Sequence, residues 1–192
     1  MQVNDSNRNR RSIALLALGC LVLQLALAPN LALGNGRINF ALVFAAYVAL
    51  TIGGRTGVAC GFLAGLAFDL CTTGPVGLMS LLLTVASFAM GMEERNRLAE
   101  DPSGSVVLFL LAAAATTLAY HLAMFLVGQA SSLFDVLFLR TLPTLLLSAV
   151  AFLPFAYVGS RSGGSPLSLG GGSRGLHGRK GKGGGRFDLG SL

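Results

Sequence analysis

Three ionisable side chains lie within or at the edge of long apolar segments of this sequence: Asp69, His121 and Arg140. A carboxylate inside a bilayer costs about 2.5–3.5 kcal/mol on insertion scales, so it usually faces a partner group or a water-filled cavity. If the apolar segments are membrane helices, these three residues lie at a similar depth in the bilayer. This predicts an intramembrane polar cluster that includes an Asp69–Arg140 ion pair. The alternative is that Asp69 reaches the outer headgroups and caps the following turn.

Enzymatic chemistry is not indicated by these residues. One aspartate and one histidine are too few ligands for a metal site, and the second histidine, His177, lies in a glycine-rich tail. The cysteines Cys20, Cys60 and Cys71 match no zinc spacing and are typical of small membrane-buried side chains. The tail glycines have no strand-to-helix context, so they do not form a phosphate loop. The sequence predicts a protein that is not an enzyme and that holds no cofactor.

Glycines recur at every fourth residue before Asp69, at Gly57, Gly61 and Gly65. Positions four apart share one helix face, so this helix presents a smooth strip that ends in a carboxylate. Small residues let membrane helices approach closely and make dispersion contacts and weak Cα–H···O bonds. Two interpretations follow. The strip packs against another helix of the same chain, or it is a docking face for a partner helix, which would include Asp69 and Gly77.

A charged segment between two apolar runs contains Glu93, Glu94, Arg95 and Arg97. Such a segment is typical of a solvated connection between helices. It is also the largest internal surface predicted on the cytoplasmic side. It is therefore a candidate contact site for a soluble partner.

Composition indicates the class of protein that must position these residues. Of the 192 residues, 53% are hydrophobic and 11% are charged, whereas about 25% are charged in a typical soluble domain. The net charge of +6 would suit nucleic acid, but most of the basic residues lie at the two ends of the chain. That placement is typical of membrane topology and of attraction to anionic lipids. The sequence therefore predicts an integral membrane protein that does not bind nucleic acid.

Six apolar runs predict an all-α integral membrane fold, a compact bundle of about six short-looped transmembrane helices. The runs cover residues 13–33, 38–52, 57–70, 78–92, 106–127 and 136–158. The first, fifth and sixth are long enough for a hydrocarbon core of about 30 Å. The middle three would reach only about 22 Å, so they cross as short helices or include a re-entrant segment shielded by the outer helices. We favour six crossings, which put both basic ends on one side.

The distribution of Lys and Arg predicts the orientation of the bundle. With a cytoplasmic start, only Arg37 and Arg140 of the 14 basic residues fall outside. Both termini are therefore predicted to be cytoplasmic, and the protein to lie as a multi-pass protein in the bacterial inner membrane. A signal peptide cleaved near Ala28 is the alternative, but the apolar run continues past that point to Leu33.

Three regions follow from this pattern: a basic cytoplasmic N-terminus (1–11), a six-helix transmembrane domain (12–160) and a flexible basic cytoplasmic tail (161–192). The tail is rich in Gly, Ser, Lys and Arg and cannot build a core. It would be solvated and reinforce the orientation, or it would tether the protein to anionic lipids or to an acidic cytoplasmic partner.

The arrangement of Gly61, Gly65 and Asp69, followed by Gly74 and Gly77, resembles the rod shape-determining MreD family of bacterial membrane proteins. That family has a short glycine-rich helix that ends in Asp, then a glycine about eight residues later that opens the next helix. Chain length, six apolar runs and short loops also fit across the predicted transmembrane domain. The long basic tail and the absence of Trp depart from the family pattern.

The resemblance implies a scaffold rather than a catalyst. Such a protein would bind the membrane helix of a single-span partner, MreC. It would thereby help couple cytoplasmic MreB filaments to the peptidoglycan synthases outside, within the cell-elongation machinery. Because the predicted outer loops are only a few residues long, recognition would occur mostly within the bilayer, which agrees with a glycine strip as the docking face.

A second interpretation comes from another class of protein. The predicted architecture is also similar to the substrate-binding subunits of energy-coupling vitamin transporters. That role would need an outward-facing pocket at the level of Asp69, His121 and Arg140, closed by loops 71–77 and 128–135. These loops are short and offer few side chains to hold a ligand, so the scaffold is the favoured interpretation.

Overall fold

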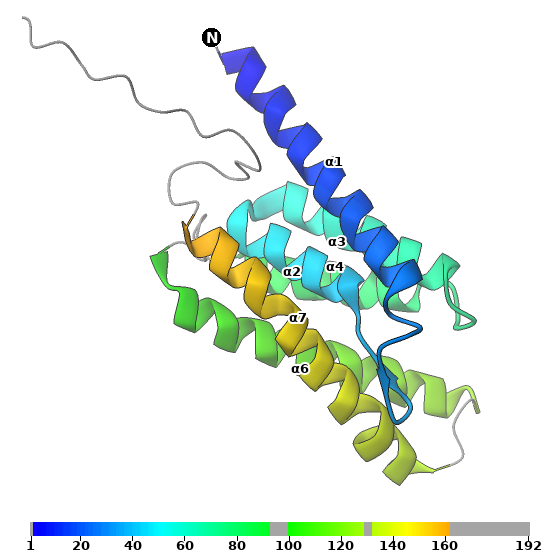
Figure 1. Cartoon of the computed structure of the whole chain (residues 1–192). Helices are drawn as coiled ribbons and strands as arrows, with labels where there is room; N and C mark the ends of the chain where they lie inside the picture. Colours follow the sequence, from blue (N-terminus) through cyan, green and yellow to red (C-terminus); the bar gives the residue numbers. More distant parts are fainter. Residues whose placement is uncertain (1, 93–99, 129–131, 162–192) are drawn as a thin grey trace, which may run out of the picture.

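The computed structural model describes residues 2–92, 100–128 and 132–161, with side chains from Arg11 onward. The predicted contact residues Glu93, Glu94, Arg95 and Arg97 and the tail 162–192 lie outside the described residues. Within the described residues six α-helices pack into one bundle (Figure 1): α1 (Gln2–Ala26), α2 (Phe40–Thr51), α3 (Gly54–Leu70), α4 (Leu78–Gly91), α6 (Pro102–Leu126) and α7 (Leu142–Arg161). A π-helical segment, η1 (Asp135–Thr141), leads into α7, and a hairpin of two short strands follows α1: β1 (Ala32–Leu33) and β2 (Gly36–Arg37).

Each predicted apolar run corresponds to a helix, with shifted ends. The largest shift concerns the first run, because α1 already begins at Gln2 and ends at Ala26. The basic N-terminal residues therefore continue the first helix. Residues 32–37, counted with the first run or the loop after it, form the antiparallel β1–β2 pair. Pro29 cannot continue a helix, and Gly34 adopts a φ of +60° in the hairpin turn. The predicted all-α bundle thus includes one small hairpin.

Helix α2 lies at the centre of the bundle. All twelve of its residues are buried, and α1, α3, α4 and α7 pack around it. A helix that is apolar on every side is expected to be enclosed by other elements. The side chain of Asn39 starts it by accepting the backbone N–H of Leu42 at 3.0 Å. At about 18 Å long, α2 is shorter than a hydrocarbon core of about 30 Å, and its neighbours shield it.

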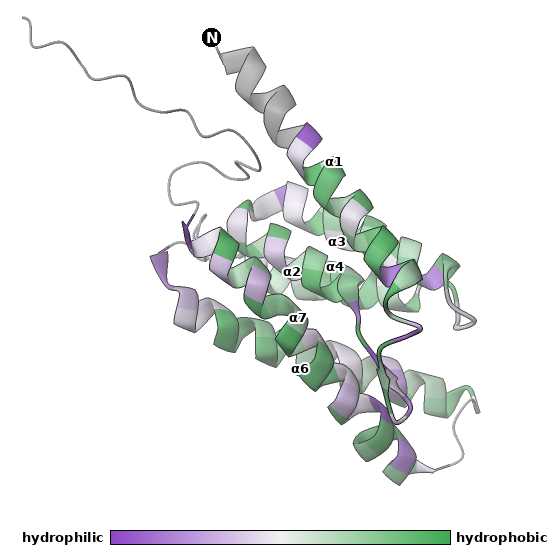
Figure 2. Ribbon diagram, in the orientation of Figure 1, coloured by the Kyte–Doolittle hydropathy of each residue, from purple (hydrophilic) through white to green (hydrophobic). Residues whose placement is uncertain are grey.

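Two helical segments are long and apolar enough to cross a membrane, Pro102–Leu126 and Asp135–Arg161. Figure 2 shows that apolar residues predominate along the helices of the bundle, and many large apolar side chains are exposed on its outside. On these two segments Leu111, Leu146 and Val150 are each more than 60% exposed. Such an outer surface suits contact with lipid. The number of crossings stays a prediction.

Successive helices run in opposite directions, so their ends gather at two sides of the bundle (Figure 1). We call one side the hairpin end, because it carries the β1–β2 hairpin, the α3–α4 turn and η1. The other side carries the starts of α1, α3 and α6 and the end of α7, and we call it the terminal end. Asp69, His121 and Arg140, the residues of the predicted polar cluster, lie at the hairpin end.

Candidate functional site

Asp69 lies near the end of α3 and is 1% exposed. Its carboxylate accepts three backbone N–H groups at the start of α4. One oxygen accepts from Gly77 at 2.8 Å and from Ser80 at 3.1 Å, and the other accepts from Met79 at 3.2 Å. The first N–H groups of a helix lack partners within the helix and carry partial positive charge. Asp69 therefore caps the next helix, and these N–H groups stabilise the buried carboxylate without a cation.

The backbone conformation explains why a glycine occupies position 77, eight residues after Asp69. Gly77 immediately precedes α4 and has a φ of +98°, a backbone conformation that residues other than glycine rarely adopt. In that conformation its N–H reaches the Asp69 carboxylate. The pairing of an acid with a later glycine, noted in the sequence, is thus one structural unit that joins α3 to α4.

The glycine strip of α3 is covered by α4 at Gly61 and Gly65 and by Ala49 of α2 at Gly57. A Cβ atom on Gly65 would lie 2.6 Å from the backbone nitrogen of Ser80 and 2.7 Å from the carbonyl oxygen of Met79. A Cβ atom on Gly61 would lie 2.8 Å from the carbonyl oxygen of Leu83. Both contacts involve backbone that cannot move aside easily. Glycine is therefore required for the close approach of these two helices.

The surface of α4 that meets the strip includes two small polar residues, Ser80 and Ser87. Ser80 donates its hydroxyl to the carbonyl oxygen of Phe62 on α3 at 2.9 Å. Ser87 is fully buried, and its hydroxyl lies where a Cβ on Gly61 would be. Sequence analysis did not single out these serines. Their spacing of seven residues, about two helical turns, was the signal that could have identified them.

Gly57, Gly61, Gly65 and Asp69 are the buried residues of α3, so the strip is not open to a partner. The docking face expected from these residues and Gly77 is already occupied by helices of the same chain. Of the two interpretations, packing within the chain describes the structure. A partner helix on this strip would first have to displace α4.

Arg140 pairs with Asp135, not with Asp69. Its Nε donates to Asp135 at 2.9 Å, and Asn35 of the hairpin donates to the other oxygen of that carboxylate at 3.1 Å. Both partners of the ion pair lie in η1, and residues five apart are brought together by the wider turn of a π-helix. The expected Asp69–Arg140 ion pair is therefore wrong, because each residue has a different partner.

His121 is held by a hydroxyl from the same π-helical segment. Its Nδ1 lies 3.1 Å from Oγ1 of Thr141, and this hydroxyl donates to the carbonyl oxygen of Val136 at 2.7 Å. Because the hydroxyl proton is already used, His121 donates through Nδ1. Among the three residues of the expected polar cluster, His121 and Arg140 line one pocket, and Asp69 is not part of its lining.

That pocket, which we call the hairpin-end pocket, has a volume of about 280 Å³. Its lining combines apolar side chains with polar ones that sequence analysis did not assign to a site, among them Arg37, Asn39, Thr72 and Tyr120. The hairpin supplies part of the lining. A hairpin this short has no periodic signal, so the sequence did not place Arg37 beside Arg140.

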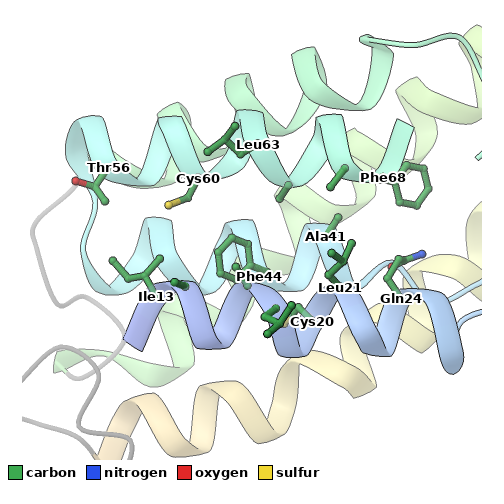
Figure 3. A pocket seen from close by; sticks show the side chains of 15 residues that line it. Ile13, Cys20, Leu21, Gln24, Ala41, Phe44, Thr56, Cys60, Leu63 and Phe68 are labelled. Atoms are coloured by element: carbon green, nitrogen blue, oxygen red, sulfur yellow. The ribbon is translucent and has the colours of Figure 1, made fainter. Parts of the chain in front are cut away.

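A second hollow is almost entirely apolar. It has a volume of about 490 Å³ and lies between α1 and α3, with α2 beside both (Figure 3). We call it the α1–α3 groove. Side chains of three helices line it, including Ile13 and Leu21 of α1, Phe44 of α2, and Cys60 and Leu63 of α3.

The comparisons with known proteins place the chain in a family. The family model for the rod shape-determining protein MreD matches residues 9–158, a stretch that begins within α1 and ends within α7. The chain belongs to the MreD family. No curated protein and no solved structure matches it. The resemblance inferred from Gly61, Gly65, Asp69 and Gly77 is confirmed.

For this MreD protein, the residues that carry the resemblance are explained by packing. They hold α3 against α4 and fix the turn between them. MreD proteins are membrane proteins of cell shape determination, and family membership indicates that role for this chain. Because helix packing covers the motif itself, the two hollows are the candidate binding surfaces that we consider on the part of the chain that the structure describes.

Proposed function

We propose that this MreD protein is a scaffold of the bacterial cell-elongation machinery that holds the membrane helix of a single-span, MreC-like partner. The observation that carries this proposal is the apolar α1–α3 groove. Family membership supports the shape-determining role, and the groove supplies a surface within the bilayer on which a helix fits.

The groove has the dimensions of a helix contact. Its residues on α1 run from Ile13 to Gln24, about three helical turns or 16 Å. The amide oxygen of Gln24 is already occupied, because it accepts the N–H of Phe40 at 2.8 Å. Since lipid tails are as apolar as a helix, close packing must supply the affinity. The walls suit close packing because each carries small residues: Ala14, Ala17, Ala64 and Ala67.

The topology belongs to the same proposal. With both termini in the cytoplasm, the hairpin end faces outward, and the basic tail and the segment 93–97 face inward. The tail then contacts anionic lipids, and the charged segment can contact a soluble partner. MreB filaments and peptidoglycan synthases are reached indirectly through the single-span partner.

A vitamin-type transporter subunit is the second candidate function. The observation in its favour is the hairpin-end pocket, which is lined by His121 and Arg140 but not by Asp69, the third residue that this interpretation expected. This role would require ATPase subunits as partners. The two functions therefore predict different partners that copurify with the protein from solubilised membranes.

The experiment is to tag the full chain in its native host, solubilise the membranes in mild detergent and identify what copurifies. A single-span protein with a periplasmic coiled coil is the expected partner. Recovery of ATPase subunits in its place would overturn the scaffold and support the transporter subunit. An unrelated tagged membrane protein of similar abundance serves as the control for non-specific recovery.

A further inference from the structure

The hairpin-end pocket has a polar lining that helix packing does not need. It lies where the end of α1, the hairpin, the end of α3, α6 and η1 meet, and Tyr120 and His121 of α6 form part of its lining. At about 280 Å³ it is near the lower limit of ligand pockets, which begin at about 300 Å³. That volume accommodates a headgroup or a small molecule, not a helix.

Two arginines give this pocket its charge. Arg37 and Arg140 line both the pocket and an adjoining recess of about 360 Å³ beside the hairpin. Asp135 balances Arg140, whereas Arg37 forms no ion pair with any residue that the structure describes. The positive charge of Arg37 is therefore not balanced by an acidic side chain among the described residues that line the pocket and the recess. Guanidinium groups bind phosphate and carboxylate oxygens through two parallel N–H donors.

A buried amide inside the pocket lacks a strong partner. Asn39 lines the pocket and is 2% exposed. Its oxygen accepts the N–H of Leu42, but its nitrogen has only the sulfur of Met79, at 4.0 Å. A thioether is a weak acceptor, and a buried donor without a good partner costs free energy. A ligand oxygen in the pocket would satisfy it.

The hairpin that carries Arg37 is held firmly against η1 and α7. The backbone N–H of Arg37 donates to Oγ1 of Thr144 at 3.2 Å, and that of Asn35 donates to the carbonyl oxygen of Leu139 at 3.1 Å. Between them, Gly36 lies so close that a Cβ would be 2.8 Å from the side chain of Pro143. Arg37 therefore starts from a fixed backbone position, which lowers the entropy cost of binding.

We propose that the hairpin-end pocket binds a phosphate group, with Arg37 and Arg140 taking its oxygens and the Asn39 amide donating from inside. One leftover positive charge matches the single charge of a phosphodiester. Such a group reaches the pocket either as a lipid headgroup or on a small soluble molecule. This site is independent of the scaffold proposal, because the α1–α3 groove has a separate lining apart from Gln24 and Phe68.

The experiment measures thermal unfolding of the purified full chain in an uncharged detergent, with three probes titrated in turn: dihexanoyl phosphatidylglycerol, its soluble phosphodiester counterpart glycerophosphoglycerol, and dihexanoyl glycerol. The variants are Arg37→Gln and Asn39→Asp, which keeps a side-chain oxygen for the α2 cap but adds a negative charge. Arg55→Gln is the matched control, because Arg55 is an exposed arginine at the terminal end.

We expect a phosphate-bearing probe to raise Tm saturably in the wild type and in Arg55→Gln. Arg37→Gln should weaken the apparent affinity about tenfold, and Asn39→Asp should abolish the response. A response to the short-chain lipid alone identifies a lipid headgroup, and a response to glycerophosphoglycerol identifies a soluble phosphodiester. An equal response to dihexanoyl glycerol, no response to any probe, or identical affinities in Arg37→Gln and Arg55→Gln would overturn the proposal.

Discussion

The carboxylate of Asp69 accepts the backbone N–H of Gly77 at 2.8 Å, across the turn that the two residues bracket. The buried carboxylate needs hydrogen-bond donors. The N–H of Gly77 can reach it because the backbone at residue 77 adopts a φ of +98°, which residues other than glycine rarely adopt. Two more N–H groups of α4 complete the contact. The α3–α4 pair is therefore one structural unit that these three hydrogen bonds hold together.

Asp69→Ala should lower the free energy of unfolding by about 1–3 kcal/mol, because it leaves three N–H groups, two of them buried, without their acceptor. Asp69→Asn should lower it less, since the amide oxygen can still accept. Thermal unfolding of the purified full chain in detergent measures both. Asp135→Ala is the control, because that carboxylate is part-exposed. If Asp69→Ala and Asp135→Ala lower Tm equally, the buried cap does not stabilise the fold as described.

Gly65→Ala should destabilise the protein by about 1–3 kcal/mol, the usual cost of forcing an added methyl into packed structure. Its Cβ would meet the backbone of Ser80 and Met79. Gly19→Ala is the matched control on α1, where an added Cβ has no neighbour within 4 Å, so helix propensity should leave Tm unchanged or raise it slightly. A Gly65→Ala protein that unfolds like the wild type but loses its partner would instead restore the docking-face interpretation.

A double-mutant cycle distinguishes the observed ion pair from the expected one. Asp135→Asn and Arg140→Gln should show a coupling energy of about 0.2–1 kcal/mol, as is usual for pairs near the surface. Asp69→Asn and Arg140→Gln should be additive within about 0.3–0.5 kcal/mol. Both cycles use unfolding of the same detergent-solubilised chain. Coupling confined to the Asp69 cycle would show that the pairing described here is not the one in solution.

Sequence periodicity predicted the helices well, and the reason is physical. Long apolar runs have few structural solutions in lipid, so each run became a helix. The glycine spacing likewise identified one face of α3 correctly. Periodicity does not say which element covers a face, however, and for that reason the strip of Gly57, Gly61 and Gly65 admitted two interpretations. The choice between them depended on the serines of α4, which belong to the next helix and not to α3 itself.

The parts that escaped prediction are those set by tertiary contacts. Arg140 was predicted to pair with Asp69 only because the two residues were expected at a similar depth in the bilayer. The π-helical geometry of η1 instead brings Asp135 within hydrogen-bond distance of Arg140. The hairpin after α1 depends on Asn35 docking on η1, which no local pattern reveals. The complete burial of α2 follows from the neighbours that surround it, whereas its own sequence indicates only that it is apolar.

The proposed orientation predicts that Cys71 is labelled from outside. Cys71 is exposed at the hairpin end, whereas Cys20 is buried. A membrane-impermeant maleimide should therefore label the wild type in spheroplasts, and Cys71→Ser should remove the label. With Arg55→Cys added to Cys71→Ser, labelling should require permeabilised membranes, because position 55 lies at the opposite end. Labelling of Arg55→Cys before permeabilisation, with none of Cys71, would reverse the topology.

Leu63→Trp should fill part of the α1–α3 groove and reduce copurification of the single-span partner. Leu63 lines the groove and is 60% exposed, so a larger side chain there need not disturb the core. Phe62→Trp is the matched control: Phe62 is the adjacent residue, it is 47% exposed, and it is not part of the groove lining. Both variants should keep the wild-type Tm, and only Leu63→Trp should lose the partner. Because a membrane helix binds through close packing rather than through apolarity alone, one misplaced indole should be enough to weaken the contact. If Leu63→Trp retains the partner at the wild-type level, the helix binds elsewhere on the bundle.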